Sequence, residues 1–184
     1  MQVSLLFAPC YMINLMSERS NPAPASTEIL LARLESLGIS VRTHSHAPVF
    51  TVEENKAVRD GLPGGHCKNL FLKDKKGALW LIVCCEDRAI DMKNLRHLIG
   101  SHHLSFGKPE LLMQVLGVRP GAVTPFALIN DSENRVRVVL DEDMMRAELL
   151  NYHPLTNGMT TAITPADLLI FIGACGHEPA VVCL

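Results

Sequence analysis

The sequence predicts one mixed α/β domain built on a mixed or antiparallel sheet. Helical and strand-like patterns alternate along the chain. Two pairs of neighbouring β-rich runs, 66–74 with 78–85 and 126–129 with 135–140, are each separated by a short turn-forming segment. Adjacent hairpins are typical of mixed or antiparallel sheets rather than of doubly wound parallel ones. The 184 residues suffice for one well-packed core and are few for two.

The composition is that of a globular protein. Apolar residues make up 48% of the chain and charged residues 20%, which argues against general disorder. A net charge of −2 provides no overall field that would attract nucleic acid, so an RNA contact would need a local basic patch. The six cysteines lack the regular spacing of a disulfide-stabilised secreted domain, so a reducing cytoplasm is expected.

The first 25 residues are expected to lie outside the domain. Residues 1–16 are apolar, but they have no basic n-region, and Pro9 interrupts the run well below the length of a membrane span. Residues 17–25 are polar and proline-rich, as in a linker. We therefore expect a flexible leader and linker over 1–25, a domain over 26–184, and no signal peptide or membrane partner.

The N-terminal part of the domain predicts two helices and a strand. A helix is expected over 27–37, ended by Gly38, because its leucines fall on one stripe at Leu30, Leu34 and Leu37. Alternating apolar and polar residues predict a strand over 39–43. A Thr-x-x-Glu capping box predicts a second helix over 51–61.

The remaining elements follow from turn and cap residues. The first β-rich pair predicts a central hairpin with its turn at Lys75-Lys76-Gly77. Asp91 caps a helix, and Pro109 begins another that ends at Gly117. The second β-rich pair predicts a hairpin around 131–134, followed by a short helix. A last helix is expected to begin at Thr164-Pro165 and end near Gly176, before a final strand over 180–184.

The run 65–74 is the most informative stretch for chemistry. As a strand, it places Lys68 on one face with Leu70 and Leu72. Asn69 points to the opposite face. A lysine on an apolar face is costly unless it snorkels to solvent or serves a site, and both explanations fit this strand alone.

The same region suggests two alternative hypotheses, a thiol nucleophile and a metal site. His66 and Cys67 are neighbours, but adjacent strand residues project to opposite faces and cannot easily form a nucleophile–base pair, so Cys67 is interpreted as a small core residue. Potential metal ligands gather in the sequence at His44, His46, His66, Cys67, Cys84 and Cys85. They show neither HExxH nor paired CxxC spacing, so we expect no metal.

Two loops offer further candidates. The segment 117–126 is dense in glycine and proline; Gly121 would let backbone approach a ligand closely, and Pro125 would stiffen the segment. A rigid connection explains this loop equally well. In 151–157, His153 is fixed before a proline and could position a substrate, although a lone loop histidine is usually structural or solvated.

Several stretches, taken together and in this order, resemble the prolyl-tRNA editing domains, the YbaK/ProRS-associated domain family. They are CKNLFLKDKKGALWLIV, GVRPGAVTPFALIND, the Tyr152-His153-Pro154-Leu155 step with Asn157, and TTAITPADLLIF with GHEP near the end. The family comprises the insertion domain of bacterial prolyl-tRNA synthetases and its freestanding relatives. The resemblance begins near residue 26 and is strongest to the freestanding alanyl-specific members.

This resemblance implies a largely antiparallel, barrel-like mixed sheet with surrounding helices, and hydrolysis of the ester that joins alanine to proline tRNA. Lys68 matches the family's functional lysine, Gly121 and Pro125 its Gly-x-x-x-Pro loop, and His153 its pocket histidine. The backbone of that loop is expected to hold the aminoacyl ester. The expected catalytic residues are Lys68, Gly121 and His153, and the expected substrate-binding residues are Asn69, Pro125 and Phe126.

The resemblance also implies the protein's surroundings and leaves alternatives open. The expected partner is mischarged proline tRNA, without a cofactor, and the freestanding relatives suggest a homodimer. Gly158-Met159 departs from the Thr-Ala expected in close relatives, which leaves the specificity for alanine open. The alternative is a nucleic-acid-binding module without catalysis, which would use the basic residues Lys68, Lys73, Lys75, Lys76, Arg88, Lys93 and Arg96. Basic residues in such a set more often form a solvated face than a binding patch.

Overall fold

The computed structural model describes residues 23–46 and 61–184. Its strands are β1 (Arg42–Ser45), β2 (Gly65–Asp74), β3 (Leu79–Cys85), β4 (Leu104–Phe106), β5 (Val136–Asp141), β6 (Leu150–Tyr152), β7 (Met159–Ile163) and β8 (Ala180–Val182). Its helices are α1 (Thr27–Ser36), α3 (Met92–Leu98), α4 (Pro109–Leu116) and α5 (Pro165–Ala174), with 3₁₀ helices η1 (Pro125–Asn130) and η2 (Met144–Arg146). Most of the predicted helix over 51–61, and most of the predicted leader, lie outside the described residues.

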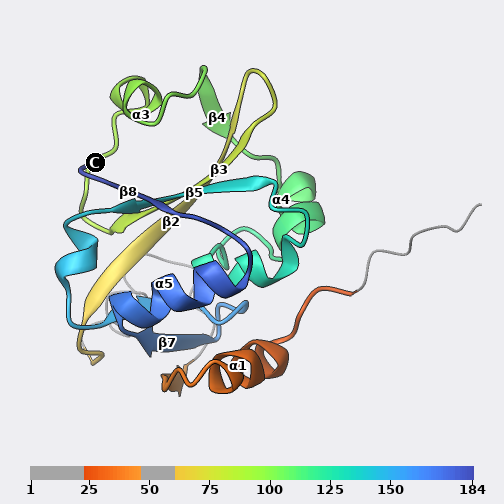
Figure 1. The fold of residues 1–184 in the computed structure, drawn as a ribbon, viewed down its shortest axis with the longest axis vertical. Coiled ribbons are helices and arrows are strands. Elements are labelled where there is room, and N and C mark those ends of the chain that lie inside the picture. The colour runs from red at the N-terminus through yellow and green to blue at the C-terminus, as the bar shows by residue number, and fades with distance from the viewer. Residues whose placement is uncertain (1–22, 47–60) are drawn as a thin grey trace, which may run out of the picture.

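The strands form one eight-stranded mixed sheet with helices around it (Figure 1). The strand order is β1-β7-β6-β2-β3-β5-β8, and β4 lies beside the far end of β2. Four of the seven pairings are antiparallel, and β2 with β6, β3 with β5 and β5 with β8 are parallel. The predicted mixed α/β class is therefore confirmed. Among the described residues no helix is long and apolar enough to cross a bilayer.

The predicted central hairpin is confirmed by β2 and β3. They pair antiparallel in a register that places Lys68 opposite Cys84. Gly77 has a φ of 95° in the turn, a conformation that favours glycine. The carboxylate of Asp74 accepts hydrogen bonds from the backbone N–H groups of Lys76 and Ala78. These turn contacts fix the register that positions Lys68.

The predicted second hairpin is wrong. Residues 126–129 lie in the 3₁₀ helix η1, and β5 pairs in parallel with β3 instead. Thr124 starts η1 by accepting a hydrogen bond from the N–H two residues later, and Pro125 occupies the first helical turn. The Asp131 carboxylate accepts the backbone N–H groups of 135 and 136, which ends the turn before β5. Local capping thus outweighs the β propensity of this short apolar run.

The first strand begins later than predicted. The expected strand over 39–43 is displaced to Arg42–Ser45. Gly38 adopts a φ of 73° after α1, and the N–H of Ile39 bonds back to the Leu34 carbonyl. Ile39 therefore belongs to the helix cap and packs into the core, where it is 5% exposed.

The predicted helices within the described residues are confirmed, and their caps explain where they begin. Side-chain oxygens of Ser26, Asp91 and Thr164 accept backbone N–H groups at the starts of α1, α3 and α5. Pro109 begins α4, and Gly117 ends it in the left-handed conformation. A short helix, η2, follows β5, and β8 forms the last strand, as predicted.

The hairpin separates two apolar clusters. The larger cluster includes Phe126, Phe171 and Tyr152, and Phe71 of β2 points into it. The smaller cluster joins Leu72 of β2 to β3, α3, β4 and β5. Successive residues of β2 therefore face different clusters, which confirms the predicted alternation.

Candidate active site

Lys68 lies on the face of β2 that carries the smaller apolar cluster. Leu70 packs against this cluster, and Leu72 belongs to it, so Lys68 extends an apolar face. Its Nζ donates a hydrogen bond to the main-chain carbonyl of Arg88. In the part of the chain that the structure describes, Lys68 forms no ion pair. The half-buried ammonium therefore has a neutral hydrogen-bond partner and keeps its positive charge uncompensated by a carboxylate contact.

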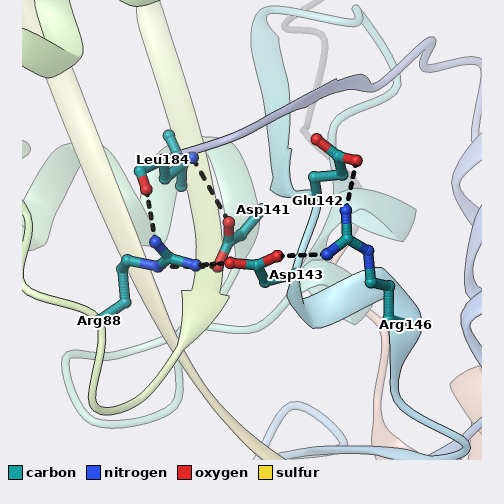
Figure 2. A network of polar contacts seen from close by, with 6 residues as sticks. All are labelled: Arg88, Asp141, Glu142, Asp143, Arg146 and Leu184. Atoms are coloured by element: carbon teal, nitrogen blue, oxygen red, sulfur yellow. Dashed lines mark hydrogen bonds and ion pairs between the residues drawn. The ribbon is translucent and has the colours of Figure 1, made fainter.

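Arg88 lies in the turn after β3 and anchors a polar network, shown in Figure 2. Its guanidinium contacts the carboxylates of Asp141 and Asp143 and donates to the main-chain oxygen of Leu184 at 2.7 Å. Asp143 also binds Arg146 at 2.9 Å. The Asp141 side chain is fully buried, whereas that of Asp143 is 44% exposed. The guanidinium thus joins the turn that accepts Lys68 to the end of β5 and to the chain after β8.

Asn69 and Cys67 face the larger cluster, on the side of β2 opposite Lys68. The Asn69 Oδ1 is buried and has no hydrogen-bond partner among the described residues. Cys67 packs against the larger cluster, which confirms its interpretation as a core residue. Burial raises the pKa of the Cys67 thiol to about 12, although a hydrogen bond with Tyr152 acts in the opposite direction. The thiol is therefore protonated at neutral pH.

The predicted Gly-x-x-x-Pro loop is exposed at one end and anchored at the other. Gly121 is exposed with a φ of 90°, and no heavy atom lies within 4 Å of the Cβ that a larger residue would add. Pro125 and Phe126 are buried. The Phe126 ring packs edge-on against Tyr152 and Phe171, with centroid distances of 5.8 and 5.5 Å. The loop therefore presents its backbone near Gly121 and is held from beneath by Phe126.

His153 follows β6 and is partly buried. Its Nδ1 lies 2.8 Å from the Met159 carbonyl. A carbonyl only accepts, so Nδ1 carries the proton and Nε2 is the acceptor of the neutral ring. Burial lowers the pKa of His153, and the nearby His46 ring, 6.2 Å away between centroids, acts in the same direction. The neutral imidazole is favoured.

Strand pairing relates two of the predicted site residues. The parallel pairing of β2 and β6 joins His66 to Asn151, and Lys68 and His153 each follow two residues later. No motif or spacing in the sequence links these two strands. Gly121 lies on a separate loop, and among the described residues no hydrogen bond or ring contact joins it to Lys68 or His153.

Sequence reasoning missed Arg88 and Asp141 as part of the lysine's surroundings. The sequence places Arg88 only among the basic residues of the nucleic-acid-binding alternative, or of a solvated face. In the structure its main-chain carbonyl accepts Lys68, and its side chain pairs with a buried carboxylate. The one available signal was Asp141 itself, an acid that directly follows the apolar run Val138-Val139-Leu140. Within the described residues no three His, Cys, Asp or Glu side chains gather closely enough to hold a metal ion.

Comparison with known proteins identifies the family. The profile of the aminoacyl-tRNA editing domain matches residues 46–171. The chain is 37% identical over 175 residues to the Danio rerio prolyl-tRNA synthetase associated domain-containing protein 1, covering 92% of this chain and 95% of that protein. It is 34% identical over 151 residues to the prolyl-tRNA editing protein ProX of Acetoanaerobium sticklandii, covering 82% and 92%.

A solved structure shares the fold. The crystal structure of a candidate trans-editing enzyme for prolyl tRNA synthetase matches with a TM-score of 0.65 and 20% identity, covering 87% of this chain and 98% of that one. The arrangement of a mixed sheet with surrounding helices is therefore common to both. Together with the profile match and the two relatives, this confirms the resemblance seen in the sequence: the chain belongs to the aminoacyl-tRNA editing domain family.

Proposed function

We propose that this chain is a freestanding trans-editing deacylase that hydrolyses the ester of alanine mischarged onto proline tRNA. The observation that carries the proposal is the Lys68 ammonium, which lies on an apolar sheet face with a neutral partner. Its position matches the functional lysine of the family. A relative named for prolyl-tRNA editing aligns with 82% of the chain, which supports the same activity.

The proposed reaction needs positioning more than a protein nucleophile. A water oxygen attacks the ester carbonyl carbon, the bond from that carbon to the ribose oxygen breaks, and alanine leaves as the ribose hydroxyl regains its proton. The aminoacyl ester is already activated, so fixing it beside a water supplies much of the rate. The Lys68 ammonium would stabilise the negative charge that develops on the carbonyl oxygen, or bind a phosphate of the terminal nucleotide.

His153 and the exposed loop supply complementary groups in this proposal. The neutral His153 ring offers Nε2 as an acceptor for a water or ribose hydroxyl proton. The backbone around Gly121, with Pro125 held in the core, would cradle the ester. Asn69 is proposed to bind the substrate because it lies beside the family's functional lysine; its buried Oδ1 faces the larger cluster, on the opposite side of β2 from Lys68.

The proposed preference for alanine is supported by the limits of the synthetase. A pocket shaped for proline cannot strongly reject a smaller amino acid, because lost apolar contacts amount to only about 1–3 kcal/mol. A second, smaller pocket must then remove the error. The partner in this proposal is mischarged proline tRNA in the cytoplasm, and the protein acts as a homodimer without a cofactor.

The test is a deacylation panel with proline tRNA charged separately with alanine, serine, cysteine and proline. We expect rapid hydrolysis of the alanyl ester, little hydrolysis of the prolyl ester, and full activity in excess chelator. Loss of activity that zinc restores would support a metal-dependent hydrolase instead. Tight binding of uncharged tRNA without turnover of any of the four esters would support the binding-module alternative.

A further inference from the structure

We propose that Arg88, held by Asp141, is a positioning residue that fixes the Lys68 ammonium in its working place. The proposal rests on the proposed function in one respect, because Lys68 must act on the ester for its position to affect turnover. The geometry itself is independent of that assignment. Lys68 Nζ meets the carbonyl of the residue whose side chain joins β5 and the chain after β8.

The backbone at residue 88 is held from both sides. The Arg88 N–H donates to the Cys85 carbonyl at 3.1 Å, which closes the turn after β3. Its guanidinium binds three separate groups, the Asp141 and Asp143 carboxylates and the main-chain oxygen of Leu184. A guanidinium offers a rigid planar fork of donors, so three partners leave it little freedom. The carbonyl that accepts Lys68 is therefore fixed in space.

Asp141 makes this anchor specific to Arg88. Its side chain is fully buried at the end of β5, and its two oxygens receive the Arg88 Nε at 3.3 Å and the Leu184 N–H at 3.5 Å. A buried carboxylate is stable when it is paired and hydrogen-bonded. Arg88 supplies its only ion pair among the described residues. The buried carboxylate thus selects one position for the guanidinium.

The Arg88 carbonyl is a neutral acceptor at a fixed position, which suits a lysine that acts on a substrate. A lysine side chain has a flexible four-carbon stem, and its ammonium would otherwise sample many positions. A carboxylate partner would hold it too, but would also neutralise the charge that the proposed reaction uses. The Arg88 carbonyl restricts the ammonium and leaves its charge unpaired. The two aspartates bind the guanidinium, as Figure 2 shows, and among the described residues no ion pair joins them to Lys68.

The test compares the same substitution at the two arginines of Figure 2. Arg88→Lys retains a charge for Asp141 but loses the three-way fork, whereas Arg146→Lys changes an arginine that binds Asp143 and Glu142 and does not contact Lys68. We expect Arg88→Lys to lower the single-turnover rate on alanyl proline tRNA about tenfold to a hundredfold, and Arg146→Lys to remain within twofold of the parent. Asp141→Asn, which keeps the shape of the anchor, should act in the same direction as Arg88→Lys.

Two readouts separate positioning from loss of stability. In a Lys68→Ala background, Arg88→Lys should cause no further loss, because it acts through the missing ammonium. In NMR spectra, the proton exchange of the Lys68 ammonium should speed up about tenfold in Arg88→Lys and stay unchanged in Arg146→Lys, whether or not the protein deacylates any ester. Additive losses in the double variant, or an unchanged Lys68 signal in folded Arg88→Lys and Asp141→Asn, would overturn the proposal. If the parent protein has no deacylase activity but the Lys68 signal changes in Arg88→Lys, the positioning role is upheld and the proposed function is rejected.

Discussion

Replacing Cys67 tests whether a thiol takes part in the reaction. Burial raises the pKa of this thiol to about 12, so at pH 7 only about one molecule in 10⁵ carries the reactive thiolate. The side chain also faces the larger apolar cluster, on the opposite side of β2 from Lys68. Cys67→Ala should therefore retain at least half of the deacylation rate. Its loss of packing should lower the free energy of unfolding by about 1 kcal/mol.

The assay is single-turnover deacylation of alanyl proline tRNA between pH 6.5 and 9, with Cys183→Ala as a matched control because Cys183 is exposed. A thiolate mechanism would make the rate rise about tenfold per pH unit over this range, since the thiol titrates only near pH 12. We expect no such rise in the parent, and the same profile in both variants. A thousandfold loss in Cys67→Ala, with the circular dichroism spectrum and Cys183→Ala unchanged, would refute this reasoning.

Three further predictions follow from the site. Phe126→Ala should lower the free energy of unfolding in urea by about 3–5 kcal/mol, because the ring is fully buried against two aromatic neighbours; a loss below 1 kcal/mol would show that it does not anchor the loop. Burial holds the pKa of His153 below 6.5, so the folded protein binds this proton less readily than the unfolded chain; the resulting stability is present above about pH 6.5 and is lost as pH falls through the lowered pKa. Turnover should likewise stay level from pH 8 to 6.5 and decline only below that range, and a decline centred above pH 6.5 would contradict the neutral role of the ring. Lys75 and Lys76 lie at the exposed hairpin tip. Lys75→Ala and Lys76→Ala should weaken tRNA binding slightly, as measured by filter binding at several salt concentrations. The single-turnover rate at saturating protein should be unchanged.

Local chemistry made much of the fold predictable from the sequence. Ser26, Asp91 and Thr164 are helix caps whose side chains act within three residues, so no distant contact is needed to predict them. The face of Lys68 was predictable for a similar reason. The two-residue period of a strand assigns each side chain to a face once the strand itself is identified.

The features that the sequence did not predict depend on long-range contacts or on competing local signals. The run 126–129 has the composition of a strand, but the cap at Thr124 and the carboxylate of Asp131 make it a 3₁₀ turn. The contact between Arg88 and Asp141 joins residues 53 positions apart. No spacing rule links two such positions, and only the parallel pairing of β3 with β5 brings them together.

The most direct measurement for the central claim is the single-turnover rate of Lys68→Ala on alanyl proline tRNA, with the fold confirmed by circular dichroism. Removing a partly desolvated ammonium also removes its desolvation cost, so the variant should fold. We predict a rate loss on the order of a hundredfold or more, as when a preorganised catalytic donor is removed. Lys68→Arg should restore only part of the rate, because a planar guanidinium does not fit the place of a compact ammonium. A folded Lys68→Ala protein that hydrolyses the ester at the parent rate would contradict the assignment of this lysine and the site built around it.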